Sequence, residues 1–319
     1  MNEFLNTDFR FLNDWWRYVV GTILVFVGYS LGQLPLLLLL KYKVDSDSSL
    51  DNSLFAEFEN DMDFSKFGLS LNVGFFMLLL MFVFGMVALY LVVKYLHNKP
   101  FLELITSKTS LNYSKILFGF GLWAIMSIAF EIFSYFMYPD EYMMTFDVIE
   151  FIPLLIIVVL MLPIQTSFEE LFVRGYLMQG MGVYAKHRWV PIFLTSVFFA
   201  LLHGTNPEVA KYGVVTMGFY YIIAGLFLAI ITVMDDSMEL ALGVHAATNM
   251  IGALLITYEG SVLQTDTIFK VGEVKPVMMI IGFLIMAATF IYICHRKYGW
   301  SSLSYLFGSK PMHPSSENV

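Results

Sequence analysis

Long apolar runs divide the chain, and short polar stretches separate them. A helix needs about 20 mostly apolar residues to cross the hydrocarbon of a bilayer. None of the runs alternates apolar and polar residues as membrane-spanning strands do. The pattern therefore predicts an all-α polytopic membrane protein with about eight transmembrane helices in a bundle. The expected spans are 19–40, 69–93, 116–137, a run from 151 into the stretch 166–180, the short run 190–203, and then 212–234, 239–257 and 277–294.

The composition supports this class. Of the 319 residues, 58% are hydrophobic and only 14% are charged, and the mean hydropathy is +0.71. Soluble domains carry about a quarter charged residues. The net charge of −8 comes from acids in loops, and no basic patch occurs, so nucleic acid is not an expected partner. The single cysteine, Cys294, excludes an intrachain disulfide framework.

One membrane domain is expected over residues 15–298, between an N-terminal segment, 1–14, and a tail, 299–319, that we expect to be disordered. The N-terminus carries two acids before its first basic residue, which is not typical of a cleavable signal peptide. The absence of a targeting segment favours a bacterial inner (plasma) membrane.

Loop charges predict the orientation in the bilayer. The third loop, "YPDEYMMTFDVIE", has four acids and no base, and the first loop is mostly acidic. Because basic loops face the cytoplasm, both termini are expected there. The basic residues of the second, fourth and last loops are Lys94, Lys99, Lys108, Lys115, Lys186, Arg188, Arg296, Lys297 and Lys310.

Several polar residues interrupt the predicted spans. Charges inside spans are rare and usually face a cavity or a partner. Glu170 and Arg174 are four residues apart, so they share a helix face and are expected to pair. Glu169 is rotated by about 100° from Glu170, so we expect it to point elsewhere and to lack a local partner. The full set is Glu131, Glu169, Glu170, Arg174, His203 and His245, with Asn249 as a polar neighbour.

The same four-residue spacing recurs in "FALLH", 199–203, and in "HAATN", 245–249. Each pattern has a structural explanation of its own: an ion pair, an interfacial histidine, or hydrogen bonds between helices. Glu131 has no matching partner, and we interpret it as structural or cavity-lining. Three polar faces on three helices are much harder to explain by coincidence, and they predict one shared cavity within the membrane.

Two kinds of hydrolytic chemistry suit such a cavity. A carboxylate and an imidazole can hold and deprotonate a water molecule, while a second imidazole and a carboxamide can donate hydrogen bonds to an oxyanion. Alternatively, Glu169, His203 and His245 could ligate Zn²⁺ and leave the fourth position to water. The chain contains neither H-E-x-x-H nor G-x-S-x-G, so the usual zinc-protease and serine-hydrolase motifs are absent.

The three motifs, "EELFVR", "FALLH" and "HAATN" in this order, resemble the E-E-x-x-x-R, F-x-x-x-H and H-x-x-x-N series of the CPBP intramembrane protease family, also called the Abi or type II CAAX prenyl endopeptidase family. The resemblance covers about residues 150–255. It implies an eight-helix fold, a cavity that opens toward the cytoplasm, and hydrolysis of a peptide bond in the membrane.

The resemblance also implies roles for individual residues. Glu169 would activate water with His203, while His245 and Asn249 would form the oxyanion site. Glu170 belongs to the same catalytic set, and Arg174 and Phe199 would support it structurally. The chain departs from the family before His245, where Asp235, Asp236 and Glu239 replace an apolar lead, at what would be the edge of the substrate entrance.

The expected partners are the lipid bilayer and a membrane-bound peptide or protein substrate, such as a prenylated C-terminus or a precursor peptide. Two alternatives remain at this stage. The chain could be a non-catalytic scaffold or immunity protein of the same fold, although its intact polar motifs disfavour this. It could also be a transporter with a polar path, in which a break at Pro163 widens the cavity.

Overall fold

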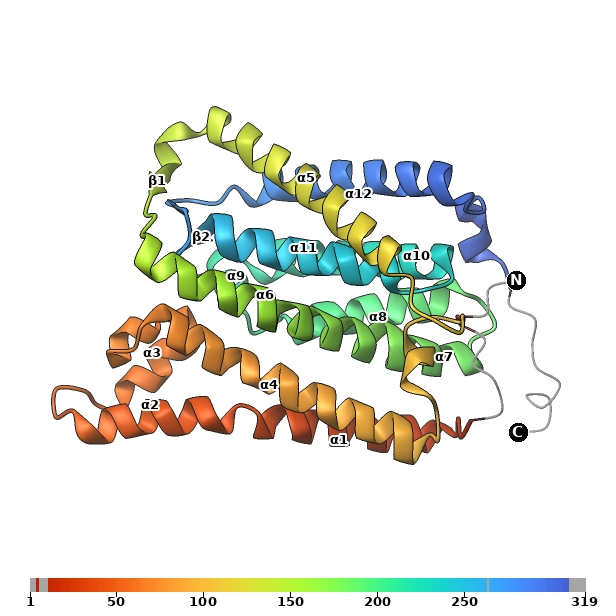
Figure 1. Cartoon of the computed structure of the whole chain (residues 1–319), viewed down its shortest axis with the longest axis horizontal. Helices are drawn as coiled ribbons and strands as arrows, with labels where there is room; N and C mark the ends of the chain where they lie inside the picture. The colour runs from red at the N-terminus through yellow and green to blue at the C-terminus, as the bar shows by residue number, and fades with distance from the viewer. Residues whose placement is uncertain (1–3, 6–10, 263, 310–319) are drawn as a thin grey trace.

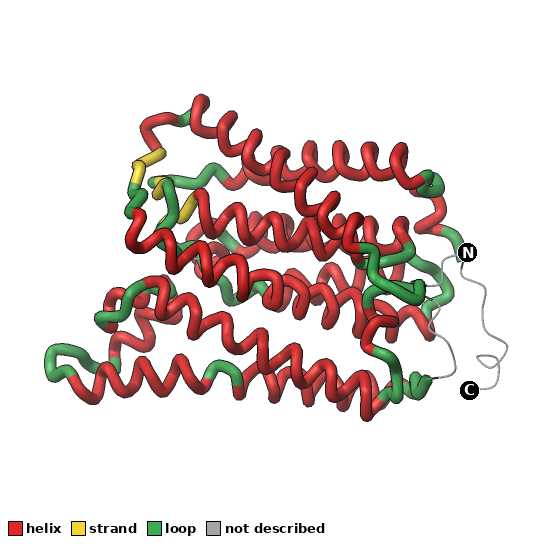
Figure 2. Tube along the Cα trace, viewed as in Figure 1, coloured by secondary structure: helices red, strands yellow, loops and turns green. Residues whose placement is uncertain are grey.

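The computed structural model describes residues 4–5, 11–262 and 264–309. Long helices run side by side through the whole molecule, and strands occur only at one end of it (Figures 1 and 2). The α-helices are α1 (Trp15–Leu31), α2 (Leu34–Ser46), α3 (Ser53–Asp61), α4 (Leu71–Leu91), α5 (Tyr113–Met137), α6 (Val148–Glu170), α7 (Gln179–Tyr184), α8 (Trp189–Leu202), α9 (Pro207–Tyr212), α10 (Val214–Asp235), α11 (Glu239–Leu255) and α12 (Pro276–Tyr298). Two π-helical segments, Val92–Leu96 and Leu171–Met178, extend α4 and α6, and short 3₁₀ turns occupy Phe64–Phe67, Phe101–Leu104, Pro139–Glu141 and Leu303–Phe307.

The predicted spans all correspond to helices. Within the described residues, 6 helices are long and apolar enough to cross a membrane, and two shorter apolar helices, Trp189–Leu202 and Glu239–Leu255, account for the other two predicted spans. The protein is therefore a polytopic helical membrane protein, as predicted. The long helices are Trp15–Ser46, Leu71–Leu96, Tyr113–Met137, Val148–Tyr184, Val214–Asp235 and Pro276–Tyr298.

The bundle has two distinct ends (Figure 1). At one end, called here the sheet end, β1 (Tyr142–Met144) pairs antiparallel with β3 (Phe269–Val271), which pairs parallel with β2 (Ile256–Tyr258). The other end, called here the termini end, holds the starts of α1, α5 and α8 and the ends of α10 and α12. Strands of three residues are too short to show an alternating sequence pattern. Their pairing satisfies the backbone N–H and C=O groups of the segments that connect the helices.

The helix α6, which contains the start of the motif "EELFVR", is continuous over its whole length. Asp147 caps α6 by accepting a hydrogen bond from the Ile149 N–H. The predicted break at Pro163 is wrong, since α6 continues through that residue to Glu170. A proline removes one backbone hydrogen bond, and neighbouring helices can hold the remainder of the helix in place. Beyond Glu170 the backbone widens into the π-helix Leu171–Met178, whose residues are all buried.

Close backbone contact positions the helix that carries the third motif. At Gly243 in α11, an added Cβ would lie 2.1 Å from the carbonyl oxygen of Ile116 in α5, and at Gly119 in α5 it would lie 2.7 Å from the carbonyl oxygen of Leu240. Only glycine permits such an approach. This crossing fixes α11, and with it His245, against the rest of the bundle.

The chain after α12 is partly ordered, contrary to the expectation of a disordered tail from residue 299. Gly299 ends α12 with φ 65°, after which Trp300 and Leu306 are buried. Arg188 donates hydrogen bonds from Nη1 to the carbonyl oxygens of Gly308 and Ser309. The predicted disorder of residues 310–319, and Lys310 with it, lies outside the described residues.

Candidate active site

Residues of all three motifs line one cavity of about 580 Å³ inside the bundle. Its walls come from α1, α4, α6, α8, α10, α11 and α12, so segments far apart in the chain are brought together as the motifs predict. The polar residues of interest on its surface are Gln165, Glu169, His203, Asn206, Glu208, Tyr221, His245, Thr248 and Asn249.

Glu170 and Arg174 pair as their spacing predicts. Arg174 donates from Nη1 to Glu170 Oε1 over 2.7 Å, and both side chains are completely buried. The same oxygen lies 2.8 Å from His245 Nδ1. An ionised carboxylate only accepts hydrogen bonds, so the proton of this contact is on Nδ1 and Nε2 is the ring nitrogen that remains for the cavity. Arg174 also donates to the Gly225 carbonyl at 3.2 Å, which ties α10 to the same network.

Glu169 reaches the same histidine from the other side. Its Oε2 lies 3.3 Å from His245 Nε2 and has no hydrogen-bond partner among the described residues. The prediction that Glu169 lacks a local partner is wrong, because Gln165, one turn earlier, donates from Nε2 to Glu169 Oε1 over 2.9 Å. Glu169, which lines the cavity, therefore has one oxygen fixed by Gln165 and one buried oxygen beside His245.

Gln165 is the site residue that the motif analysis missed. Its Oε1 accepts a hydrogen bond from Asn249 Nδ2 over 3.0 Å, while its Nε2 holds Glu169. The side chain thus joins the first motif to the third. The four-residue spacing between Gln165 and Glu169 is the sequence feature that could have identified it.

His203 lines the same cavity. Its Nδ1 is 2.8 Å from the Phe199 carbonyl oxygen, which can only accept, so Nε2 carries the free lone pair. The His203 ring packs against the Tyr221 ring at 4.6 Å. Within the described chain, no carboxylate is ion-paired with His203, in contrast to His245. Phe199 supports both groups, since its ring lies 4.3 Å from His203 and 4.4 Å from the Arg174 guanidinium.

The three expected zinc ligands, Glu169, His203 and His245, do not form a metal site among the described residues. A catalytic zinc site needs three protein ligands besides water. Glu169 and His245 are adjacent, but among the described residues no three His, Cys, Asp or Glu side chains come close enough to hold one metal ion. The arrangement therefore does not fit a zinc site with three protein ligands.

Two groups of acids singled out in the sequence lie away from the cavity. Glu131 accepts a hydrogen bond from the Tyr142 hydroxyl at 3.2 Å, in a structural role near the sheet end. Asp235 pairs with Lys115 at 2.7 Å, and Glu239 accepts from the Asn112 N–H and the Ser237 hydroxyl. None of Asp235, Asp236 and Glu239 lines the cavity. They lie where α10 ends and α11 begins, so their expected place at the edge of the substrate entrance is wrong for this cavity.

The cavity extends from the three motifs toward the sheet end. There it is lined by Glu208 of α9, by Tyr258 of β2, and by Ser261 and Val262. None of its lining residues comes from the described loops of the termini end. The cavity therefore extends away from the end of the bundle that the loop charges predict to be cytoplasmic.

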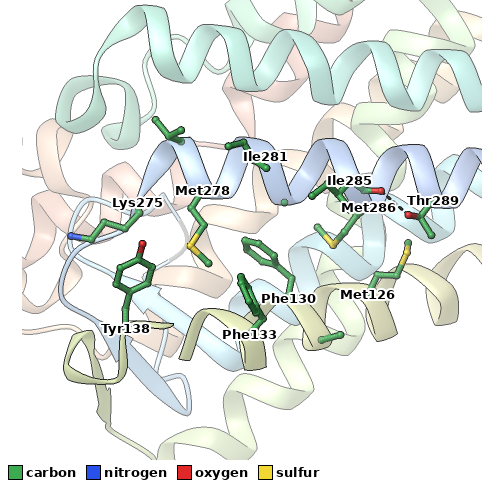
Figure 3. A pocket seen from close by; sticks show the side chains of 13 residues that line it. Met126, Phe130, Phe133, Tyr138, Lys275, Met278, Ile281, Ile285, Met286 and Thr289 are labelled. Atoms are coloured by element: carbon green, nitrogen blue, oxygen red, sulfur yellow. Dashed lines mark hydrogen bonds between the residues drawn. The ribbon is translucent and has the colours of Figure 1, made fainter. Parts of the chain in front are cut away.

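A second hollow, of about 670 Å³, lies between α5 and α12. Figure 3 shows methionine, phenylalanine and isoleucine side chains along it, with Tyr138 and Lys275 at one end. Lys275 is already paired with Glu141 and Glu273. The hollow contains no residue of the three motifs and has the apolar surface that lipid chains cover.

Comparisons with known proteins agree with this site. Residues 149–251, which contain all three motifs, match the family model described as type II CAAX prenyl endopeptidase Rce1-like. The chain is 33% identical over 255 residues to the uncharacterized protein YyaK of Bacillus subtilis (strain 168), an alignment that covers 78% of this chain and 81% of that one. No solved structure matches the chain. With its three motifs around one intramembrane cavity, the chain belongs to the Rce1-like family of type II CAAX prenyl endopeptidases.

Proposed function

We propose that the protein is an intramembrane endopeptidase that hydrolyses a peptide bond with a water molecule activated by Glu169. The observation that carries this proposal is the geometry of Glu169. One of its oxygens is fixed by Gln165, and the other lacks a hydrogen-bond partner among the described residues in a cavity of about 580 Å³. A general base must be held in position with an oxygen left to take the proton; in Glu169 that oxygen is buried beside His245.

The attack step uses two acceptors of the cavity, Glu169 Oε2 and His203 Nε2. A water molecule donates one hydrogen to Glu169 Oε2 and the other to His203 Nε2, whose orientation the Phe199 carbonyl fixes. As its oxygen bonds to the carbonyl carbon of the substrate, Glu169 takes the first proton. When the C–N bond breaks, the same proton passes to the departing amine, so Glu169 returns to its starting state.

The oxyanion formed in this step needs hydrogen-bond donors. The Asn249 amide uses one of its two hydrogens on Gln165 Oε1 and retains a second one. His245 Nε2 is the other group at this position; because Glu170 already accepts the Nδ1 proton, Nε2 can donate only when the ring is an imidazolium. Fixed donors around a buried oxyanion are worth about 100- to 1000-fold in rate each.

The substrate must enter within the membrane or from the sheet end, because the cavity extends in that direction. With the termini in the cytoplasm, as the loop charges predict, the sheet end faces the opposite side of the membrane. A membrane-bound peptide or precursor protein with its cleavage site on or beyond that side fits this arrangement better than a cytoplasmic prenylated C-terminus.

Glu169→Gln tests the proposed base. The purified protein is reconstituted in lipid vesicles, and cleavage of a library of lipid-anchored, internally quenched peptides is followed by fluorescence and mass spectrometry. We expect the rate to fall at least about 100-fold, the lower range for a general base, while expression and melting temperature stay unchanged.

Glu131→Gln is the matched control, because Glu131 is also a glutamate within a membrane span but lies outside the cavity. It should retain full cleavage. Wild-type rates in Glu169→Gln, or failure of the unaltered protein to cleave any member of the library, would contradict the proposal.

A further inference from the structure

Glu208 is a buried carboxylate at the sheet end of the active-site cavity, and the mechanism above does not use it. The residue lies on α9 with only 4% of its surface exposed. Its Oε1 accepts a hydrogen bond from the Val262 N–H at 2.8 Å and lies 3.5 Å from the Tyr258 hydroxyl. Its Oε2 is buried without any hydrogen-bond partner among the described residues.

No cation of the described chain satisfies this carboxylate. Lys211, one turn along α9, instead donates to the carbonyl oxygen of Glu259 at 2.7 Å and lies 4.0 Å from the Glu259 carboxylate. Burial raises the pKa of Glu208, because a desolvated carboxylate is costly to ionise. A buried acceptor without a partner costs free energy that a bound donor can recover.

The surroundings of Glu208 are suited to a cation. Tyr220, Tyr221 and Tyr258 line the same part of the cavity, and aromatic faces attract ammonium and guanidinium groups. Tyr221 also connects this region to the catalytic motifs: its hydroxyl accepts from Asn206 Nδ2 at 3.1 Å, and its ring packs on His203 at 4.6 Å. A substrate bound across His203 would thus extend past Tyr221 to Glu208.

We infer that Glu208 binds a cationic group of the substrate, either a lysine or arginine side chain or a free peptide N-terminus, and thereby fixes the position of the scissile bond at Glu169. The inference rests on the proposed function for its substrate class. It makes Glu208 a specificity residue, which holds the peptide a short distance from the site of cleavage.

Peptide binding to the Glu169→Gln protein tests this inference without requiring turnover. Fluorescent, lipid-anchored peptides of one sequence carry either lysine or its neutral isostere norleucine at each position in turn. Each is made with a free and with an acetylated N-terminus, and affinities are measured by anisotropy. At one or two positions, the peptide with lysine should bind about 10- to 100-fold more tightly than the peptide with norleucine, as expected for a charge-assisted hydrogen bond. If the N-terminus is the ligand, acetylation should produce that loss instead.

A second substitution, Glu208→Gln, should remove this preference and leave the affinity of the neutral, acetylated peptide unchanged. Glu208→Asp, which keeps the charge, should restore part of it. Glu259→Gln is the matched control, because its carboxylate is 83% exposed outside the cavity, and it should change neither affinity.

Equal binding of the charged and neutral peptides, absence of binding by every cationic peptide, or an equal loss for both in Glu208→Gln would overturn the inference. The comparison of peptides needs no change at position 208, so it stays decisive even if that variant folds poorly. Selective cation binding by a protein that cleaves none of the peptides would overturn only the proposed function.

Discussion

At the scale of single residues, the site is a chain of hydrogen bonds in which each polar group fixes the next. Arg174 holds Glu170, Glu170 holds His245, and Gln165 holds Glu169 and Asn249. Such a network holds its members in place even though Glu170 Oε2 and Arg174 Nε have no hydrogen-bond partner among the described residues. Removing one member leaves a further buried polar group unpaired. Substitutions should therefore separate into those that damage folding and those that damage only the chemistry.

Arg174→Ala belongs to the first kind. It leaves the completely buried Glu170 carboxylate without its ion-pair partner, which typically costs about 3–5 kcal/mol. We expect a large drop in melting temperature and in yield, measured by fluorescence-detected size-exclusion chromatography after a heating series. Wild-type stability in this variant would show that Glu170 does not depend on the pair.

Gln165→Leu belongs to the second kind. It frees Glu169 and Asn249 while keeping a side chain of similar size, so the cleavage rate should fall by about 10- to 100-fold, as expected for one hydrogen bond to a charged group. Peptide cleavage in vesicles is the measurement. Thr166→Val is the control, since the neighbouring Thr166 only donates to the Leu162 carbonyl and lies outside the cavity; a rate loss of the same size there would point to helix distortion instead.

At the scale of helices, backbone packing decides where these side chains meet. The short helices α8 and α11 lie among longer ones (Figure 1), and α11 is buried along most of its length. The π-helical segment Leu171–Met178 contains the last four residues of the motif "EELFVR", and π-helical segments are frequent at functional sites. The position of His245 depends on how closely α11 approaches α5.

Gly243→Ala tests this dependence. The added methyl group would overlap backbone atoms of Ile116 and Phe120, which cannot move as a flexible side chain can. We expect a destabilisation of about 1–3 kcal/mol or more, together with loss of cleavage, in the same heating and activity measurements. Gly252→Ala, on the same helix, meets nothing within 4 Å and should leave the melting temperature unchanged or slightly higher; because Gly252 lines the cavity, it serves as a control for stability alone. Similar stability of the two variants would contradict the proposed role of this crossing.

At the scale of the whole molecule, the two ends differ in charge as well as in structure. Since the described cavity extends only toward the sheet end, the orientation of the bundle decides which side of the membrane supplies the substrate. Basic residues are more numerous at the termini end, as expected of the cytoplasmic side. In the described chain they are Arg17, Lys94, Lys99, Lys108, Lys115, Lys186, Arg188, Arg296 and Lys297 there, against Lys41, Lys43, Lys66, Lys211, Lys270 and Lys275 at the sheet end.

Cysteine labelling in intact cells tests the orientation. Cys294 is buried and is replaced by serine, after which single cysteines are introduced at the exposed positions Ser48, in the loop after α2, and Ser110, in the loop before α5. We expect a membrane-impermeant maleimide to label Ser48→Cys in intact cells and to label Ser110→Cys only after lysis. The reverse pattern would place the cavity on the cytoplasmic side and support cytoplasmic substrates.

The amino-acid sequence by itself determined the helical membrane architecture and the motif residues. Apolar length predicts a span because hydrocarbon requires satisfied backbone groups, and four-residue spacing predicts the contact of Glu170 with Arg174 because it follows from helix geometry. These features are local, so they can be predicted without knowing how the helices pack.

Only the tertiary structure decided the contacts between helices. It paired His245 rather than His203 with Glu169, let Gln165 join two motifs, directed the cavity to the sheet end, and brought Glu208 to its wall. Each of these depends on the relative rotation and depth of helices that are distant in the chain. That arrangement is set by close contacts such as the one at Gly243, which no periodicity within a single helix encodes.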